Sequence, residues 1–77
     1  MELSRIIGSR IIELRNEKHL SQEDLCNAAG ISRKAMHNIE CGKCYVRINT
    51  LYKIINTLGI SINEFFAPFG SDYEITN

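Results

Sequence analysis

Residues 21–42 constrain the fold more than any other stretch of the chain. Ser21 and Ser32 stand eleven residues apart, and apolar residues at helical spacing follow each of them. Serine is a favoured N-cap because its side-chain oxygen accepts hydrogen bonds from the unpaired backbone N–H groups of the first turn. Gly30 lies between the two serines, where the end of a helix favours a left-handed residue. This stretch therefore predicts two short helices joined by a tight turn.

Apolar residues recur at helical spacing on both sides of this stretch. They predict a first helix over about residues 4–18 and a fourth helix over residues 48–58 that ends at Gly59. A loop over residues 41–47 precedes the fourth helix, and Ser61 marks the start of a fifth. Because caps and periodicity agree, we expect an all-α fold of five short helices around one core.

The end of the chain sets the expected domain limits. Pro68 and Gly70 should end the regular structure, because proline lacks a backbone N–H and glycine disfavours a helix interior. The sequence thus predicts one domain over residues 1–70 and a polar tail over residues 71–77. A chain of 77 residues has no room for a separate effector-binding domain.

Composition excludes several classes of protein. No stretch approaches the roughly 20 apolar residues that cross a bilayer, and the start lacks the pattern of a signal peptide. The three cysteines are an odd number, which argues against a disulfide framework. We therefore expect a cytoplasmic protein.

The net charge is zero, yet the charge is unevenly distributed. Residues 1–63 carry all nine Lys and Arg and six Asp and Glu, a charge of +3, whereas residues 64–77 carry three acids and no base. A balanced total can therefore contain a basic binding face.

Two helices joined by a tight turn make a helix-turn-helix candidate, whose second helix can lie in a DNA major groove. Arg33 and Lys34 lie in the first turn of that helix, where arginine can donate two hydrogen bonds to a guanine. Asn38 shares a face with Lys34 and carries the amide that binds adenine. We predict that these three residues contact base edges; a solvated polar face is the alternative.

Phosphate contacts are expected beside this surface. The helix that follows Ser21 presents unpaired N–H groups, and Gln22 adds a side-chain donor, which suits one phosphate. Capping by Ser21 does not exclude that role. We place Ser32 and His37 with them as phosphate contacts, although an exposed surface histidine is the alternative for His37.

The pattern continues well beyond the turn. The residues that carry it are Gly8–Ser9–Arg10–Ile11, Leu14–Arg15, SQEDL at 21–25, Gly30–Ile31–Ser32, Ile39–Glu40, Gly42–Lys43, Thr50–Leu51, Lys53–Ile54 and Leu58–Gly59–Ile60–Ser61. Over residues 8–66 the chain resembles the lambda-repressor-like (Cro/C1-type) helix-turn-helix family. The resemblance implies a five-helix DNA-binding domain that regulates transcription, as repressors of this group do, and binds a palindromic operator as a homodimer.

The resemblance also implies roles for single residues. It places Arg33, Lys34 and Asn38 at positions that read base edges. It places Ser21 and Gln22 at positions that anchor a phosphate, and Lys43 at a loop position near the DNA backbone. Arg15 and Glu40 match a buried ion pair that ties the first helix to the end of the third. Two independent surface charges are the alternative for this pair.

The sequence departs from the family at Cys26, where alanine is usual, and at Val46, where proline is common. Cys41 and Cys44 are also unusual in the loop, and His37 precedes them by one helical turn. Their spacing is that of a metal knuckle or a redox pair. A structural zinc site needs four ligands and a second pair is missing, so we expect two ordinary thiols, no metal and no cofactor.

The fifth helix holds more large apolar side chains than a small core can easily hide. We predict that part of the cluster forms a twofold homodimer contact; an entirely internal core is the alternative. The cluster consists of Ile62, Phe65, Phe66 and Phe69.

No catalytic arrangement is evident. His19 and His37 have no nucleophile at motif spacing, and no glycine-rich phosphate loop follows a strand, so we do not expect an enzyme. The expected partners are double-stranded DNA and a second copy of the chain. The alternative function is an antitoxin-like module that binds a partner protein and autoregulates its operon. A redox or metal sensor is a third possibility that depends only on the loop cysteines.

Overall fold

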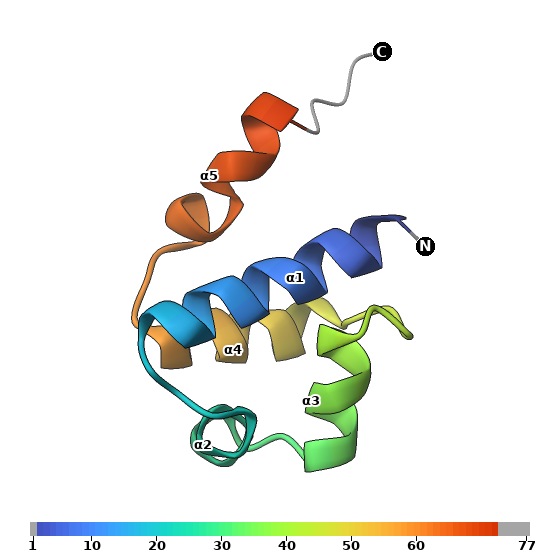
Figure 1. The fold of residues 1–77 in the computed structure, drawn as a ribbon, viewed down its shortest axis with the longest axis vertical. Helices are drawn as coiled ribbons and strands as arrows, with labels where there is room; N and C mark the ends of the chain where they lie inside the picture. The colour runs from blue at the N-terminus through green and yellow to red at the C-terminus, as the bar shows by residue number, and fades with distance from the viewer. Residues whose placement is uncertain (1, 73–77) are drawn as a thin grey trace.

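The computed structural model describes residues 2–72, and every regular element in that range is an α-helix (Figure 1). The helices are α1 (Glu2–Glu17), α2 (Gln22–Ala29), α3 (Arg33–Glu40), α4 (Ile48–Leu58) and α5 (Ile62–Asp72). The prediction of an all-α fold with five helices is confirmed. The first helix starts two residues earlier and ends one residue earlier than its periodicity predicts.

Local signals fix the ends of the two central helices as predicted. The Ser21 hydroxyl accepts from the Asp24 N–H at 2.9 Å, and the Asp24 carboxylate accepts from the Ser21 N–H at 3.1 Å. This is a complete capping box. The Ser32 hydroxyl accepts from the Ala35 N–H at 3.1 Å. Gly30 ends α2 with a φ of 72°, a left-handed conformation that glycine adopts without steric cost.

All five helices contribute to one core. α1 packs on α3, α2 packs on both α3 and α4, and α4 packs on α5. In Figure 1, α2 and α3 lie at one end of the molecule and α5 lies at the other. The side chains that are almost completely buried are Phe65, Ile11, Leu25, Met36, Ile54, Ile55 and Cys26. The core thus accepts a sulfur at position 26, whose thiol donates to the Glu23 carbonyl at 3.4 Å.

Gly8 sets the distance between α1 and the end of α3. A Cβ atom at this position would lie 2.5 Å from the Ile39 carbonyl oxygen and 2.6 Å from that of Glu40. Both neighbours are backbone atoms, which cannot rotate away as a side chain can. The absence of a side chain at position 8 therefore allows this close approach.

The prediction that Pro68 and Gly70 end the regular structure is wrong, because α5 continues through Pro68 to Asp72. Proline has no N–H to donate to the Glu64 carbonyl four residues earlier. Arg10 supplies the missing donor: its Nη2 donates to the Glu64 carbonyl at 2.8 Å and its Nε donates to the Phe65 carbonyl at 2.8 Å.

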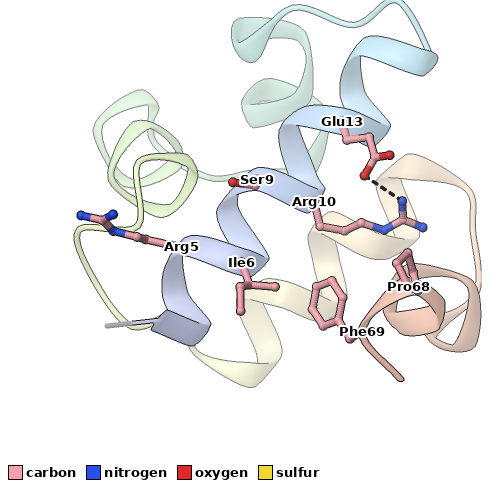
Figure 2. A pocket seen from close by; sticks show the side chains of 7 residues that line it. All are labelled: Arg5, Ile6, Ser9, Arg10, Glu13, Pro68 and Phe69. Carbon is pink, nitrogen blue, oxygen red and sulfur yellow. Dashed lines mark hydrogen bonds and ion pairs between the residues drawn. The ribbon is translucent and has the colours of Figure 1, made fainter. Parts of the chain in front are cut away.

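Figure 2 shows the Arg10 side chain extending from α1 towards α5 beside Pro68, with Glu13 holding the guanidinium from the side of α1. The first two residues of the expected polar tail therefore belong to α5, and residues 73–77 lie outside the described residues. Over the described part of the chain, no helix combines the length and apolar character needed to span a membrane.

Candidate nucleic-acid interface

The first turn of α3 presents its cationic side chains to solvent. Arg33 is the first residue of α3, and its side chain is 68% exposed; Lys34 is also exposed. On the opposite side of the helix, Met36 and Ile39 are buried in the core with exposures of 0% and 5%. Burial of this apolar side orients α3 so that Arg33 and Lys34 point away from the protein.

Asn38 lies deeper than these two cations. It is half-buried and lines a groove of about 390 Å³ between α3, the loop that follows it and α4. Arg47, Thr50 and Lys53 line the same groove. Sequence reasoning missed Arg47 and Lys53 as candidate contacts, because the groove exists only once the loop has packed against α4.

The expected phosphate contacts differ in how freely they face solvent. Ser21 and Ser32 are exposed caps whose hydroxyl oxygens accept backbone N–H groups, and the Ser32 hydroxyl keeps its proton as a donor. His37 and Lys43 are exposed. Gln22 is half-buried, and its Nε2 donates to Glu40 Oε1 at 3.1 Å, so its amide is partly engaged within the protein.

Arg15 and Glu40 form the ion pair that the resemblance implies. Arg15 donates from Nε to Glu40 Oε2 at 2.9 Å and from Nη2 to Oε1 at 3.1 Å. The two side chains are only 15% and 3% exposed. Arg15 Nη1 also donates to the Leu20 carbonyl at 3.0 Å. Together with Gln22, this network joins α1, the start of α2 and the end of α3, and so fixes the motif on the rest of the domain.

A second ion pair connects the two helices of the motif. Arg33 Nη2 donates to Glu23 Oε1 at 2.8 Å, and both side chains are well exposed, at 68% and 59%. The two residues are ten positions apart, and the turn at Gly30 brings them together. Periodicity alone does not predict this pair, because it depends on the angle between α2 and α3.

The capping box also affects the ionisation of Asp24. The Ser21 backbone N–H, and next the Ser21 hydroxyl, hold the pKa of the Asp24 carboxyl below its ordinary value of 3.8. Both hydrogen bonds favour the charged carboxylate. Asp24 thus stabilises the start of α2 as an anion, at the end of the helix where negative charge is favourable.

The loop cysteines do not meet a complete set of ligands. His37 Nε2 lies 3.5 Å from the Cys41 sulfur, and Cys41 and Cys44 are both exposed. Within the described residues, no three His, Cys, Asp or Glu side chains gather closely enough to hold a metal ion. The spacing of His37, Cys41 and Cys44 suggested that the three side chains could come together as metal ligands, and in the structure they do not.

An exposed apolar surface lies on α4 and α5. Its members, here called the α4–α5 surface, are Ile48, Tyr52, Ile62 and Phe66, which line one apolar depression. Ile48, Tyr52 and Ile62 are 78%, 53% and 49% exposed. Ile48 and Tyr52 were not among the residues predicted for a dimer contact.

The predicted dimer contact needs correction at Phe65. Phe65 is 0% exposed in the core, where its ring meets that of Phe66 edge to face at 4.9 Å, so it has no surface to offer a partner. Phe69 is half-buried; its ring meets that of Phe66 at 5.3 Å, and it also lines the groove between α1 and α5 beside Arg10 (Figure 2), so its part in a dimer contact stays a prediction. Of the predicted cluster, Ile62 and Phe66 remain at the α4–α5 surface.

Five helices, a capped α2, a tight glycine turn and an outward-facing cationic start of α3 define a helix-turn-helix DNA-binding domain. Residues 8–68 match the family model described as a helix-turn-helix domain. The chain belongs to this family of DNA-binding transcriptional regulators.

Relatives of this chain include proteins named as helix-turn-helix transcriptional regulators. The chain is 32% identical over 68 residues to the uncharacterised regulator y4dJ of Sinorhizobium fredii, covering 88% of each chain. It is 35% identical over 60 residues to the regulator PuuR of Escherichia coli, covering 78% of this chain and 32% of PuuR.

Solved structures agree with these sequence matches. The restriction-modification controller protein C.AhdI of Aeromonas hydrophila superposes with a TM-score of 0.81 at 32% identity, covering 86% of this chain and 100% of C.AhdI. A point mutant of the restriction-modification controller protein C.Esp1396I gives a TM-score of 0.86 at 26% identity, covering 97% of this chain and 100% of the other.

Proposed function

We propose that the protein binds a palindromic DNA operator as a homodimer and controls transcription by occupying it, without a catalytic step. The observation that carries this proposal is the exposed cationic first turn of α3, oriented by the burial of Met36 and Ile39. In this arrangement Arg33 and Lys34 reach base edges in the major groove. Asn38 contacts a base or a phosphate from the groove beside them.

Phosphate contacts on both sides of α3 supply most of the affinity. The hydroxyls of Ser21 and Ser32 lie at helix starts, where anions bind favourably. His37 and Lys43 are exposed near the end of α3. Arg47 and Lys53 add two cations from the loop and α4. Because such contacts release counterions, binding should weaken steeply as salt concentration rises.

The α4–α5 surface supports the homodimer. It combines exposed isoleucine and tyrosine side chains around an apolar depression, and a twofold axis would place the same patch on both copies. Two copies joined there would present two α3 helices to successive major grooves, about 34–36 Å apart. A palindromic operator is the DNA symmetry that matches this arrangement.

Selection of tightly bound duplexes from a random pool tests the DNA-binding proposal. We expect an inverted repeat whose half-sites lie about one helical turn apart. An Arg33→Ala protein should relax the preference at one base pair in each half-site, by about 1–3 kcal/mol. No enrichment of a motif would contradict operator binding, and an enriched motif without symmetry would contradict the homodimer.

Sedimentation equilibrium tests the dimer surface. Ile48→Glu should yield a monomer, because it places a charge in an apolar contact while leaving the core untouched at a position that is 78% exposed. Asn16→Glu, on exposed α1, introduces the same charge away from this surface and should remain dimeric. A wild-type protein that stays monomeric at high micromolar concentration would rule out the homodimer.

A further inference from the structure

We propose that Glu23 is a positioning residue that sets how strongly Arg33 discriminates between DNA sequences, an inference that rests on the proposed base-reading role of Arg33. Glu23 lies in the first turn of α2, and its Oε1 accepts from Arg33 Nη2 at 2.8 Å across the turn. Within residues 3–69, Glu23 is the one acidic side chain that contacts Arg33.

The pair leaves most of the guanidinium available. A guanidinium carries five N–H donors, and the contact with Glu23 engages Nη2 alone. Nη2 keeps its second N–H, which together with the adjacent N–H of Nη1 or Nε forms one two-donor edge for a guanine. The carboxylate thus holds Arg33 at one corner and leaves the rest of its planar group to face the DNA.

Holding Arg33 in place reduces the entropy that the side chain loses when it binds a base. Arginine is long and samples many rotamers when it is free, and ordering such a side chain at an interface weakens binding by about twofold to tenfold. A guanidinium already fixed by Glu23 avoids part of that loss at a matching base pair. At a mismatched base pair, Arg33 stays bonded to Glu23. Its side chain then does not move to form a substitute contact that would raise the affinity for the mismatched DNA.

The charge of Glu23 acts in the same direction. Non-specific binding comes almost entirely from the attraction between cations and phosphates. A carboxylate on the first turn of α2 neutralises Arg33 locally and repels the DNA backbone, so it weakens binding to random DNA. Matched DNA offsets this repulsion with base contacts, and the ratio of specific to non-specific affinity rises.

Stability does not account for this pair. Its side chains are 68% and 59% exposed, and ion pairs at such exposure contribute little to folding. The neighbouring acid, Asp24, is already engaged by Ser21 in the capping box, so it cannot hold Arg33 in the same way. Glu23 is thus free of a capping role and directed at the residue that reads the DNA.

Equilibrium binding of purified full-length variants tests this inference. The probes are the selected operator, the same duplex altered at the base pair that Arg33→Ala relaxes, and a random duplex, all at one salt concentration. Glu23→Ala should lower the ratio of affinities between operator and altered duplex by about twofold to tenfold. It should also tighten binding to the random duplex.

Three further variants separate position from charge. Glu23→Gln should tighten binding to random DNA as Glu23→Ala does, yet keep more of the discrimination, because its amide oxygen still accepts from Arg33. Glu17→Gln removes one negative charge from an exposed site at the end of α1 and should leave the ratio unchanged. In an Arg33→Ala background, Glu23→Ala should lower the discrimination no further.

Two results would overturn the inference, and they differ in what else they reject. If Arg33→Ala changes the selected sequence but Glu23→Ala leaves the affinity ratio unchanged, Glu23 does not position Arg33, and the proposed function stands. If Arg33→Ala itself leaves the selected sequence unchanged, the base-reading role is rejected together with the inference. Equal melting temperatures of the Glu23 variants and the wild type would show that the fold is intact.

Discussion

Replacing Arg10 by methionine should weaken the attachment of α5 to α1. Methionine keeps much of the apolar stem of the side chain and removes every donor. The native Arg10 side chain is 11% exposed, and its guanidinium donates to the Phe65 carbonyl, the Glu64 carbonyl and the Glu13 carboxylate at 2.8, 2.8 and 3.0 Å. Because residue 68 is proline, the Glu64 carbonyl lacks the donor that the residue four positions ahead normally supplies in a helix.

The expected loss follows from these three contacts. The Glu13 side chain is 57% exposed, so its ion pair with Arg10 contributes about 0–1 kcal/mol to stability. Each hydrogen bond from a charged donor contributes about 1.5–3 kcal/mol, at the lower end where water can replace it, as it can at the Glu64 carbonyl. We therefore expect Arg10→Met to lower the free energy of unfolding by about 3–5 kcal/mol.

Pro68→Ala supplies the decisive comparison. Alanine restores the N–H that the Glu64 carbonyl lacks, so Arg10→Met should cost about 1 kcal/mol less in the Pro68→Ala background than in the wild type. Urea unfolding followed by far-ultraviolet circular dichroism measures all four proteins, provided that their m-values agree. An Arg10→Met loss below about 1 kcal/mol would refute the reasoning, and so would the same loss in both backgrounds.

Three further perturbations test other parts of the structure. Glu40→Ala leaves the buried Arg15 guanidinium unpaired and should cost about 3–5 kcal/mol in urea unfolding, whereas a loss under about 1 kcal/mol would show that the pair is dispensable. The Asp24 pKa is lowered in the fold, so its contribution is complete above its ordinary value of 3.8 and is lost as pH falls through the lower native value. Asp24→Asn should therefore flatten the acid limb of thermal stability against pH, and an unchanged limb would contradict this. Gly8→Ala should cost about 1–3 kcal/mol by thermal melting, because the new methyl group meets the Ile39 and Glu40 carbonyls; a stabilised protein would contradict the close approach.

The parts of the fold that depend on neighbours in sequence were predictable. Ser21 and Ser32 cap helices through bonds to residues three positions ahead, and Gly30 ends α2 through its own φ. These interactions need no tertiary structure, so the sequence indicates them directly. The pairing of Arg15 with Glu40 spans 25 positions, and the family resemblance pointed to it where local spacing could not.

The parts that depend on distant groups were not predictable by the same reasoning. Proline ends a helix when its freed carbonyl has no donor, but Arg10, 54 positions before Glu64, supplies one here. Apolar periodicity likewise identifies the apolar face of a helix, but it does not show which residues of that face are buried by neighbouring helices and which stay exposed. Phe65 occupies the centre of the core, while Ile48 sits at the first position of α4 and is 78% exposed.

The ion pairs also explain how a chain of zero net charge can bind DNA. Arg10, Arg15 and Arg33 are each paired with a carboxylate among the described residues. Each pair neutralises one positive and one negative charge and leaves the net charge of residues 1–63 unchanged. The excess of +3 in residues 1–63 therefore stays on the other side chains. Four of the six remaining cations lie on α3, on α4 or in the loop that joins them: Lys34, Lys43, Arg47 and Lys53. Of the three acids in residues 64–77, Glu64 and Asp72 belong to α5, at the opposite end of the molecule from α2 and α3 (Figure 1). Because charges separated by more than about 8–10 Å are largely screened at physiological salt, these two acids do little to cancel the attraction of α3 for phosphate.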